Sequence, residues 1–79
     1  MNIEFKRQLL LCVNEIEILI ELVKMQPEKF MKDMLMEVGL TDIYSKYSSN
    51  VFNFATTIVI NRMERETEFI KLLGGMQYV

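Results

Sequence analysis

The chain has 79 residues, 51% of them hydrophobic, and its nine basic and eleven acidic residues give a net charge of −2. This length holds one domain, residues 1–79, with no room for a second core. The charges are mixed without a basic block, which argues against a nucleic-acid partner. The single cysteine, Cys12, excludes an internal disulfide, and with no histidine a structural zinc site is not expected. Stability must come from apolar burial, and the apolar surplus predicts surface left for a partner.

Neither a targeting segment nor a membrane span is predicted. The run Leu9–Cys12 superficially resembles the end of a lipoprotein signal. The apolar stretch before the cysteine is too short, however, and Glu4 lies in the segment that should be basic and apolar. No later stretch reaches the ~20 apolar residues of a span. The interruptions are Glu15, Glu17 and Glu21. A lone unpaired cysteine fits a reducing compartment, so we expect a cytoplasmic protein.

The N-terminal segment predicts a long amphipathic helix from Ile3 to about Met25. Asn2 can cap it, and Glu4 has the right sign for the positive end of the helix dipole. Asn14 leaves open a kink or a break into two helices. Eight apolar side chains share one broad core face at 100° per residue. They are Phe5, Leu9, Cys12, Val13, Ile16, Leu19, Ile20 and Val23.

A second, narrower apolar strip runs along the same helix. We call it the outer strip, and it consists of Leu11, Ile18, Leu22 and Met25. Two interpretations are open: it packs under a neighbouring helix, or it forms an interaction surface.

Two shorter helices are predicted next. The first runs from Pro27 to about Val38, and Gly39 closes it with a left-handed C-terminal cap. The other runs from Thr41 to about Tyr47. In the Pro27–Val38 helix, Met36 falls off the inward side. The side chains expected to point inward are Phe30, Met31, Met34, Leu35 and Val38.

The segment from Ser49 to Arg65 is predicted to be the central, most deeply buried helix. It follows three capping residues, Ser48 to Asn50. The β-branched run Thr56–Ile60 alone would favour a strand, but no other segment offers a pairing strand. A helix that is apolar over most of its circumference needs neighbours on several sides. Its apolar residues are Val51, Phe52, Phe54, Ala55, Ile58, Val59, Ile60 and Met63.

The last helix is predicted from Thr67 to about Leu73, ending at Gly74-Gly75 and leaving residues 76–79 as a loose tail. The expected fold is therefore all-α, a compact antiparallel bundle of five helices, or six if the first is split at Asn14.

This order of elements resembles the effector-associated domains of bacterial conflict systems, small modules of the death-domain-like superfamily. The likeness covers about Leu19 to Leu73, and the long first helix departs from the two short helices usual in that superfamily. The resemblance implies a death-domain-like six-helix bundle that recruits an effector or sensor by pairing with a like domain, sometimes in open helical assemblies. It is carried by Phe30–Gly39 (FMKDMLMEVG), Thr41–Tyr47, Ser48-Ser49-Asn50, the apolar helix from Val51, and Glu66–Leu73.

No catalytic, cofactor or metal site emerges from the residue pattern. There is no histidine to act as a base, no glycine-rich phosphate loop, and no serine or cysteine beside a potential base. Cys12 lies on the core face and is interpreted as a small buried hydrophobe. Glu17 and Glu21 share a helix face that Glu15 does not, which is typical of a solvated surface. We therefore expect neither an enzyme nor a cofactor.

Charges of alternating sign mark a second candidate surface, where the central helix meets the last one. We call it the mixed-charge cluster, and it consists of Arg62, Glu64, Arg65 and Glu68. A solvated corner is one interpretation. The other is a pairing surface, because complementary charges govern specificity and association rate. Head-to-tail contacts of this kind would grow open filaments.

The sequence thus predicts a non-enzymatic protein–protein interaction module. It would form homo-oligomers or dock a like helical domain, and recruit an effector in a bacterial conflict or immunity system. The alternative is a small helical dimeric regulator or inhibitor, of the phage or mobile-element type, that binds a host protein. In that case the first helix would pair in an antiparallel dimer through the outer strip. A DNA-binding regulator would need a basic recognition helix, which the chain lacks.

Overall fold

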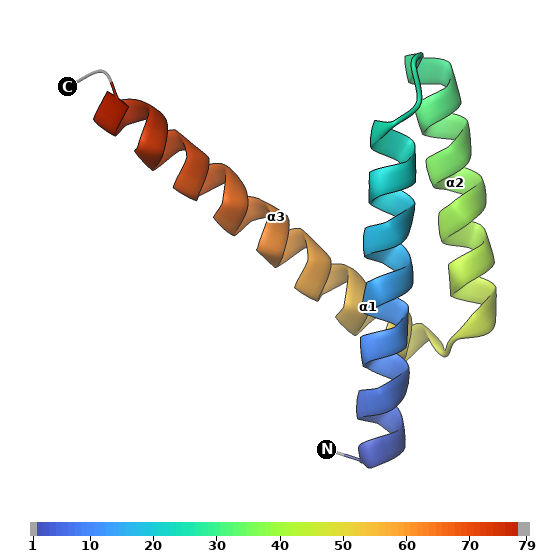
Figure 1. Ribbon diagram of the computed structural model, residues 1–79. Helices are drawn as coiled ribbons and strands as arrows, with labels where there is room; N and C mark the ends of the chain where they lie inside the picture. Colours follow the sequence, from blue (N-terminus) through green and yellow to red (C-terminus); the bar gives the residue numbers. More distant parts are fainter. Residues whose placement is uncertain (1, 78–79) are drawn as a thin grey trace.

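The computed structural model describes the backbone of residues 2–77 and the side chains of residues 2–67. The described chain folds into three helices: α1 (Ile3–Lys24), α2 (Lys29–Lys46) and α3 (Ser49–Gln77). α1 and α2 form an antiparallel hairpin, while α3 crosses α1 obliquely and projects away from the hairpin (Figure 1). The all-α prediction is confirmed. The predicted death-domain-like bundle of five to six helices is wrong.

α1 is one unbroken helix. The Asn2 side-chain oxygen accepts a hydrogen bond from the Glu4 backbone N–H at 2.7 Å, so the predicted cap is present. Such a cap stabilises a helix by about 1 kcal/mol. The helix continues without interruption past Asn14 to Lys24, so the chain has no break at Asn14.

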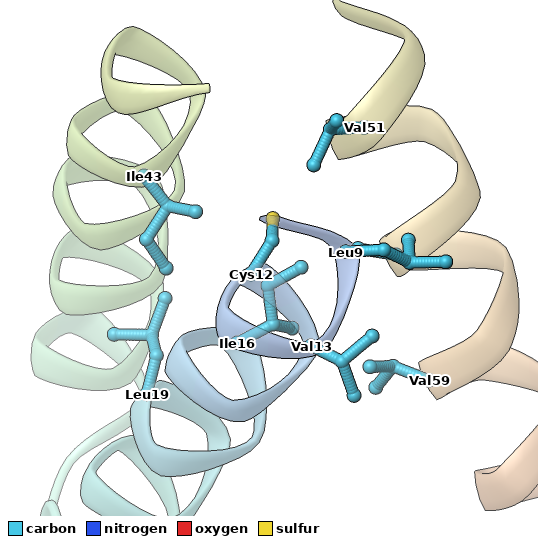
Figure 2. Packing of buried hydrophobic residues seen from close by; sticks show 9 residues of the cluster. Leu9, Cys12, Val13, Ile16, Leu19, Ile43, Val51 and Val59 are labelled. Atoms are coloured by element: carbon cyan, nitrogen blue, oxygen red, sulfur yellow. The ribbon is translucent and has the colours of Figure 1, made fainter. Parts of the chain in front are cut away.

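α1 is also the central helix, in place of the segment after Ser49. Both α2 and α3 pack against it, whereas α2 and α3 touch each other far less. The core face predicted for α1 is confirmed, since its eight side chains are buried or packed against the buried cluster. The fully buried side chains gather where α1 meets its neighbours (Figure 2). They are Leu9, Cys12, Val13, Ile16 and Leu19 from α1, Ile43 from α2, and Val51, Ala55 and Val59 from α3.

The predicted helix end at Gly39 is wrong, because α2 runs straight through this residue. No glycine in the described chain has a positive φ. Gly39 instead faces α1, where an added Cβ would overlap the Leu19 side chain and lie 2.7 Å from its Cδ2. The glycine serves close helix packing, a role that its sequence neighbourhood does not distinguish from a helix stop.

Continuation through Gly39 also rotates the buried face of α2 away from the predicted one. Met36 and Leu40 pack against the buried cluster, and Ile43 is part of it. Met36 and Ile43 lie three and four residues from Gly39, and Leu40 lies four and three residues from them, so the four residues share one broad face. Met36, expected off the inward side, is therefore partly buried. Of the side chains predicted inward, only Leu35 is partly buried. The exposed ones are Phe30, Met31, Met34 and Val38.

α3 replaces the two C-terminal helices of the prediction. The Ser48 hydroxyl accepts a hydrogen bond from the Val51 N–H at 3.2 Å, so capping at this start is confirmed. The β-branched run is helical, as expected. The helix continues without a break through Gly74-Gly75 to Gln77, so residues 76 and 77 are not a loose tail, while residues 78 and 79 lie outside the described chain.

Over residues 49–67, one stripe of α3 is buried, and Phe52 and Ile58 are partly buried beside it, so the prediction of the most deeply buried helix is wrong. The buried stripe consists of Val51, Ala55 and Val59, each four residues after the last. Among its described residues, the exposed large apolar side chains are Phe54, Ile60 and Met63. They stay open to solvent because α1 is the main neighbour of α3 and covers one side of it.

The molecule has a flat and extended outline. Its Cα extents are 48 × 35 × 14 Å, and its radius of gyration is 15.3 Å. A close-packed domain of this length has a radius of gyration of about 12 Å. Its accessible surface is 6413 Å², against about 5,000 Å² for a folded monomer of this mass. The chain thus leaves much more surface uncovered than a typical monomer.

Candidate interaction surface

The outer strip lies on the side of α1 opposite its core face. At 100° per residue, the centre of the strip lies about 150° around α1 from the centre of the core face. Neither α2 nor α3 covers the four side chains of the strip. The exposed fractions of Leu11, Ile18, Leu22 and Met25 are 46%, 51%, 47% and 76%. Of the two interpretations left open by the sequence, packing under a neighbouring helix of the same chain is thereby removed.

An open groove of about 370 Å³ borders this strip, between α1 and α2. We call it the α1–α2 groove. The buried side chains of Leu19 and Ile43 line it together with the exposed rim residues Ile18 and Leu22. Gly39 contributes no side chain, so the Leu19 side chain lies directly against it. The remaining lining residues are Glu15, Asp42 and Lys46.

The α1–α2 groove has a charged end. The Lys46 ammonium lies 3.3 Å from a Glu15 carboxylate oxygen and 3.4 Å from an Asp42 carboxylate oxygen. The hydrogen bond to Glu15, followed by that to Asp42, raises the pKa of Lys46. Lys46 therefore stays cationic near neutral pH and neutralises part of the acidic charge. The other Glu15 oxygen is buried without a hydrogen-bond partner.

Two titratable groups near this end, Tyr47 and Cys12, favour their neutral forms. Burial raises the pKa of Tyr47 to about 12, with a smaller contribution from the Glu15 carboxylate. Burial likewise raises the pKa of the Cys12 thiol, and Glu15 adds to this effect. Only the thiolate is an effective nucleophile. Cys12 is fully buried, which confirms its interpretation as a small core hydrophobe.

A second apolar pocket, of about 290 Å³, lies at the first half of α2. It is lined by Gln26, Met31, Met34, Leu35 and Val38. Helical spacing places Met31, Leu35 and Val38 on the same side of α2 as Asp42, which borders the α1–α2 groove. The sequence pattern placed Met31, Met34 and Val38 inward, whereas all three are exposed. The available signal was the density of methionine, which lines adaptable binding surfaces.

The mixed-charge cluster is not a corner between two helices, because α3 is continuous there. Arg62 donates a hydrogen bond to Glu17 of α1 at 2.9 Å and so ties the two helices together. Glu64 and Arg65 are exposed along α3. The side chain of Glu68 lies outside the described residues. The structure therefore engages Arg62 within the chain and leaves Glu64 and Arg65 exposed.

Other kinds of site find no support in the part of the chain that the structure describes. No group of three or more acidic, cysteine or histidine side chains is placed to hold a metal ion. Within the same residues, no helix combines the length and the apolar character needed to cross a bilayer.

Comparisons of the chain with protein-family models, with curated proteins and with solved structures found no match. The resemblance to effector-associated domains therefore stays a prediction, and the six helices that it implies are not formed. The interaction surface must be judged from its own residues.

Proposed function

We propose that this chain is a non-enzymatic helical interaction module that works by self-association. The observation that carries the proposal is the number of apolar side chains left exposed. Among the described residues, fourteen large hydrophobic side chains are exposed, whereas nine hydrophobic side chains are buried. Single exposed hydrophobes are ordinary, but contiguous apolar patches mark binding surfaces. The outer strip and the pocket around Met31 and Met34 are patches of this kind. A cytoplasmic location belongs to the same proposal, because an unpaired thiol fits a reducing compartment.

The size of the uncovered surface supports a second copy as the partner. The accessible surface of 6413 Å² exceeds that of a typical monomer of this mass by about 1,400 Å². A standard stable interface removes about 800 Å² from each partner. One self-contact of ordinary size would thus bring the chain close to normal burial, and association would stabilise the fold by mass action.

Of the two function classes drawn from the sequence, the dimeric regulator fits the fold better. Effector recruitment through a death-domain-like bundle depended on six helices, and this basis is gone. A long unbroken α1 with an uncovered outer strip is what the dimeric alternative required. A regulator also needs a surface for its target, and the pocket around Met31 and Met34 offers an adaptable apolar one.

Light scattering on a sizing column, over a wide concentration range, tests self-association. We expect a particle of about twice the 9.4 kDa chain mass, dissociating only at low concentration. Open-ended growth, checked by electron microscopy of the concentrated sample, would instead indicate head-to-tail assembly. A monomer at every concentration would overturn the proposal.

A further inference from the structure

Three of the four outer-strip residues are evenly spaced about Ile18. Leu11 lies seven residues before Ile18, and Met25 lies seven residues after it. Seven residues are close to two full turns, so the three side chains form one line along α1, with a drift of only about 20° per step. The line is flanked by Asn14 and Leu22, four residues to either side of Ile18.

We infer that two copies of the chain pair through antiparallel α1 helices, with the two-fold axis passing beside Ile18. This inference rests on the proposed self-association and names its surface and register. In this arrangement Ile18 meets Ile18 of the second copy, and Leu11 of each copy meets Met25 of the other. A two-fold contact of this kind uses the same patch on both molecules and closes on itself, so it yields a dimer.

The symmetric spacing is what identifies the occupant as a second copy. An arbitrary partner helix places no requirement on the spacing of the strip about its centre. An antiparallel copy places each residue of the line opposite the residue at the same distance on the other side of Ile18. Leu11 then meets Met25, an apolar pair, while Leu22 meets Asn14. The chain as a whole exposes about 1,400 Å² more than a typical monomer of its mass, which leaves room for a self-contact.

The fold leaves this surface accessible. α3 packs against the core face of α1, as its contact between Val59 and the buried cluster shows (Figure 2). α2 lies at the flank, where the α1–α2 groove opens beside Ile18 and Leu22. The charges at this flank are paired within the chain, because Lys46 contacts both Glu15 and Asp42. A second α1 can therefore approach without leaving an unpaired cation at the groove.

Engineered cysteines test the register directly. With oxidised glutathione as the electron acceptor, two thiols form a disulfide by losing two protons and two electrons. Ile18→Cys should link two copies, because residues on the axis come within disulfide distance. The matched control is Ile60→Cys on α3, whose native side chain is 53% exposed against 51% for Ile18. The native Cys12 is fully buried and should not interfere.

A mixing experiment separates antiparallel from parallel pairing. Leu11→Cys and Met25→Cys proteins, mixed after unfolding and refolding, should form the mixed disulfide at least tenfold faster than either links to itself. Preferred self-linking of Leu11→Cys would indicate parallel helices and overturn the inference. This readout uses exposed positions and is independent of the Ile18 variant.

Light scattering on the same samples keeps the two proposals distinguishable. A dimer that links through Ile18 and through the Leu11–Met25 mixture supports both. A dimer that links at neither would overturn the register and leave self-association standing. A monomer at every concentration would overturn both.

Discussion

Gly39 of α2 lies directly against the side chain of Leu19 in α1, at a distance that no residue with a Cβ could adopt without displacing it. This contact sets how closely the two helices approach, and the α1–α2 groove opens beside it. The glycine thus helps to determine both the packing of the hairpin and the shape of the adjacent surface.

Gly39→Ala should destabilise the protein by about 1 kcal/mol. Alanine favours a helix interior by about 1 kcal/mol over glycine, but displacing the buried Leu19 costs about 1–3 kcal/mol. Urea unfolding at fixed protein concentration measures the balance. In a Leu19→Ala background the overlap is gone, so the same Gly39→Ala change should become stabilising. A stabilising effect of Gly39→Ala in the parent protein would contradict the packing role.

Ile18→Glu should weaken self-association by at least tenfold. The two-fold axis would place two carboxylates side by side, and like charges so close repel strongly. Light scattering against concentration measures the effect. Ile60→Glu is the matched control, because the two isoleucines have nearly equal exposed fractions of 51% and 53%. Circular dichroism should show unchanged helix in both variants, and equal weakening by both would speak against the outer strip.

Asn14→Leu should tighten the dimer by about tenfold, which corresponds to about 1.4 kcal/mol. In the inferred register, Asn14 shares a layer with Leu22 of the second copy, so leucine would complete an apolar layer. Asn14→Ala is the control for helix propensity, because alanine favours the helix but cannot reach across the interface. Fluorescence anisotropy of a labelled chain monitors dissociation on dilution and gives the dimer dissociation constant of each variant. Equal effects of leucine and alanine would argue against the layer.

Arg65→Glu should leave the mass of the particle unchanged. Arg65 is exposed on α3, away from the outer strip. Leu22→Glu, in contrast, should reduce the mass toward that of a monomer, because it places a charge on the strip. Light scattering of the two variants side by side separates an interface on α1 from one built on the mixed-charge cluster. The reverse result would favour the cluster.

Stability should fall as the pH rises from about 10 to about 12. The folded chain holds the pKa of Tyr47 at about 12, whereas an unfolded tyrosine ionises near about 10. The unfolded state therefore loses its proton first, and the stabilisation is lost as the pH approaches the folded pKa. The raised pKa of Lys46 acts in the same direction. Tyr47→Phe should remove only the tyrosine part, so the urea midpoint of the variant should fall less than that of the parent as the pH rises.

The parts of the fold that the sequence predicts well are those that depend on one helix alone. The Asn2 cap, the core face of α1 and the start of α3 after Ser48 follow from local spacing and hydrogen bonding. Periodicity states which residues share a face. It does not state whether a neighbour covers that face, which is why the exposure of Phe54 and Ile60 was not foreseen.

The errors arise where one residue type serves two physical purposes. Gly39 followed by Leu40 and Thr41 has the features of a helix end and a new cap, yet the chain uses the glycine for close approach to Leu19. Interpreting Gly39 as a helix end gave the wrong buried face for α2. The pocket around Met31 was therefore not predicted. The outer strip was visible as a pattern, but only the positions of α2 and α3 decide that it is uncovered.

The thinness of the molecule has a consequence for how its sequence can vary. A Cα extent of 14 Å along the shortest axis corresponds to a depth of two helices, because the Cα cylinder of one helix is about 5 Å across and packed helix axes lie about 8–10 Å apart. Most positions are therefore in reach of solvent, where substitutions change stability by less than about 0.5 kcal/mol. Saturation mutagenesis scored by abundance should find intolerance concentrated at the nine buried positions and Gly39. Such a protein can drift widely in sequence while keeping its three-helix architecture.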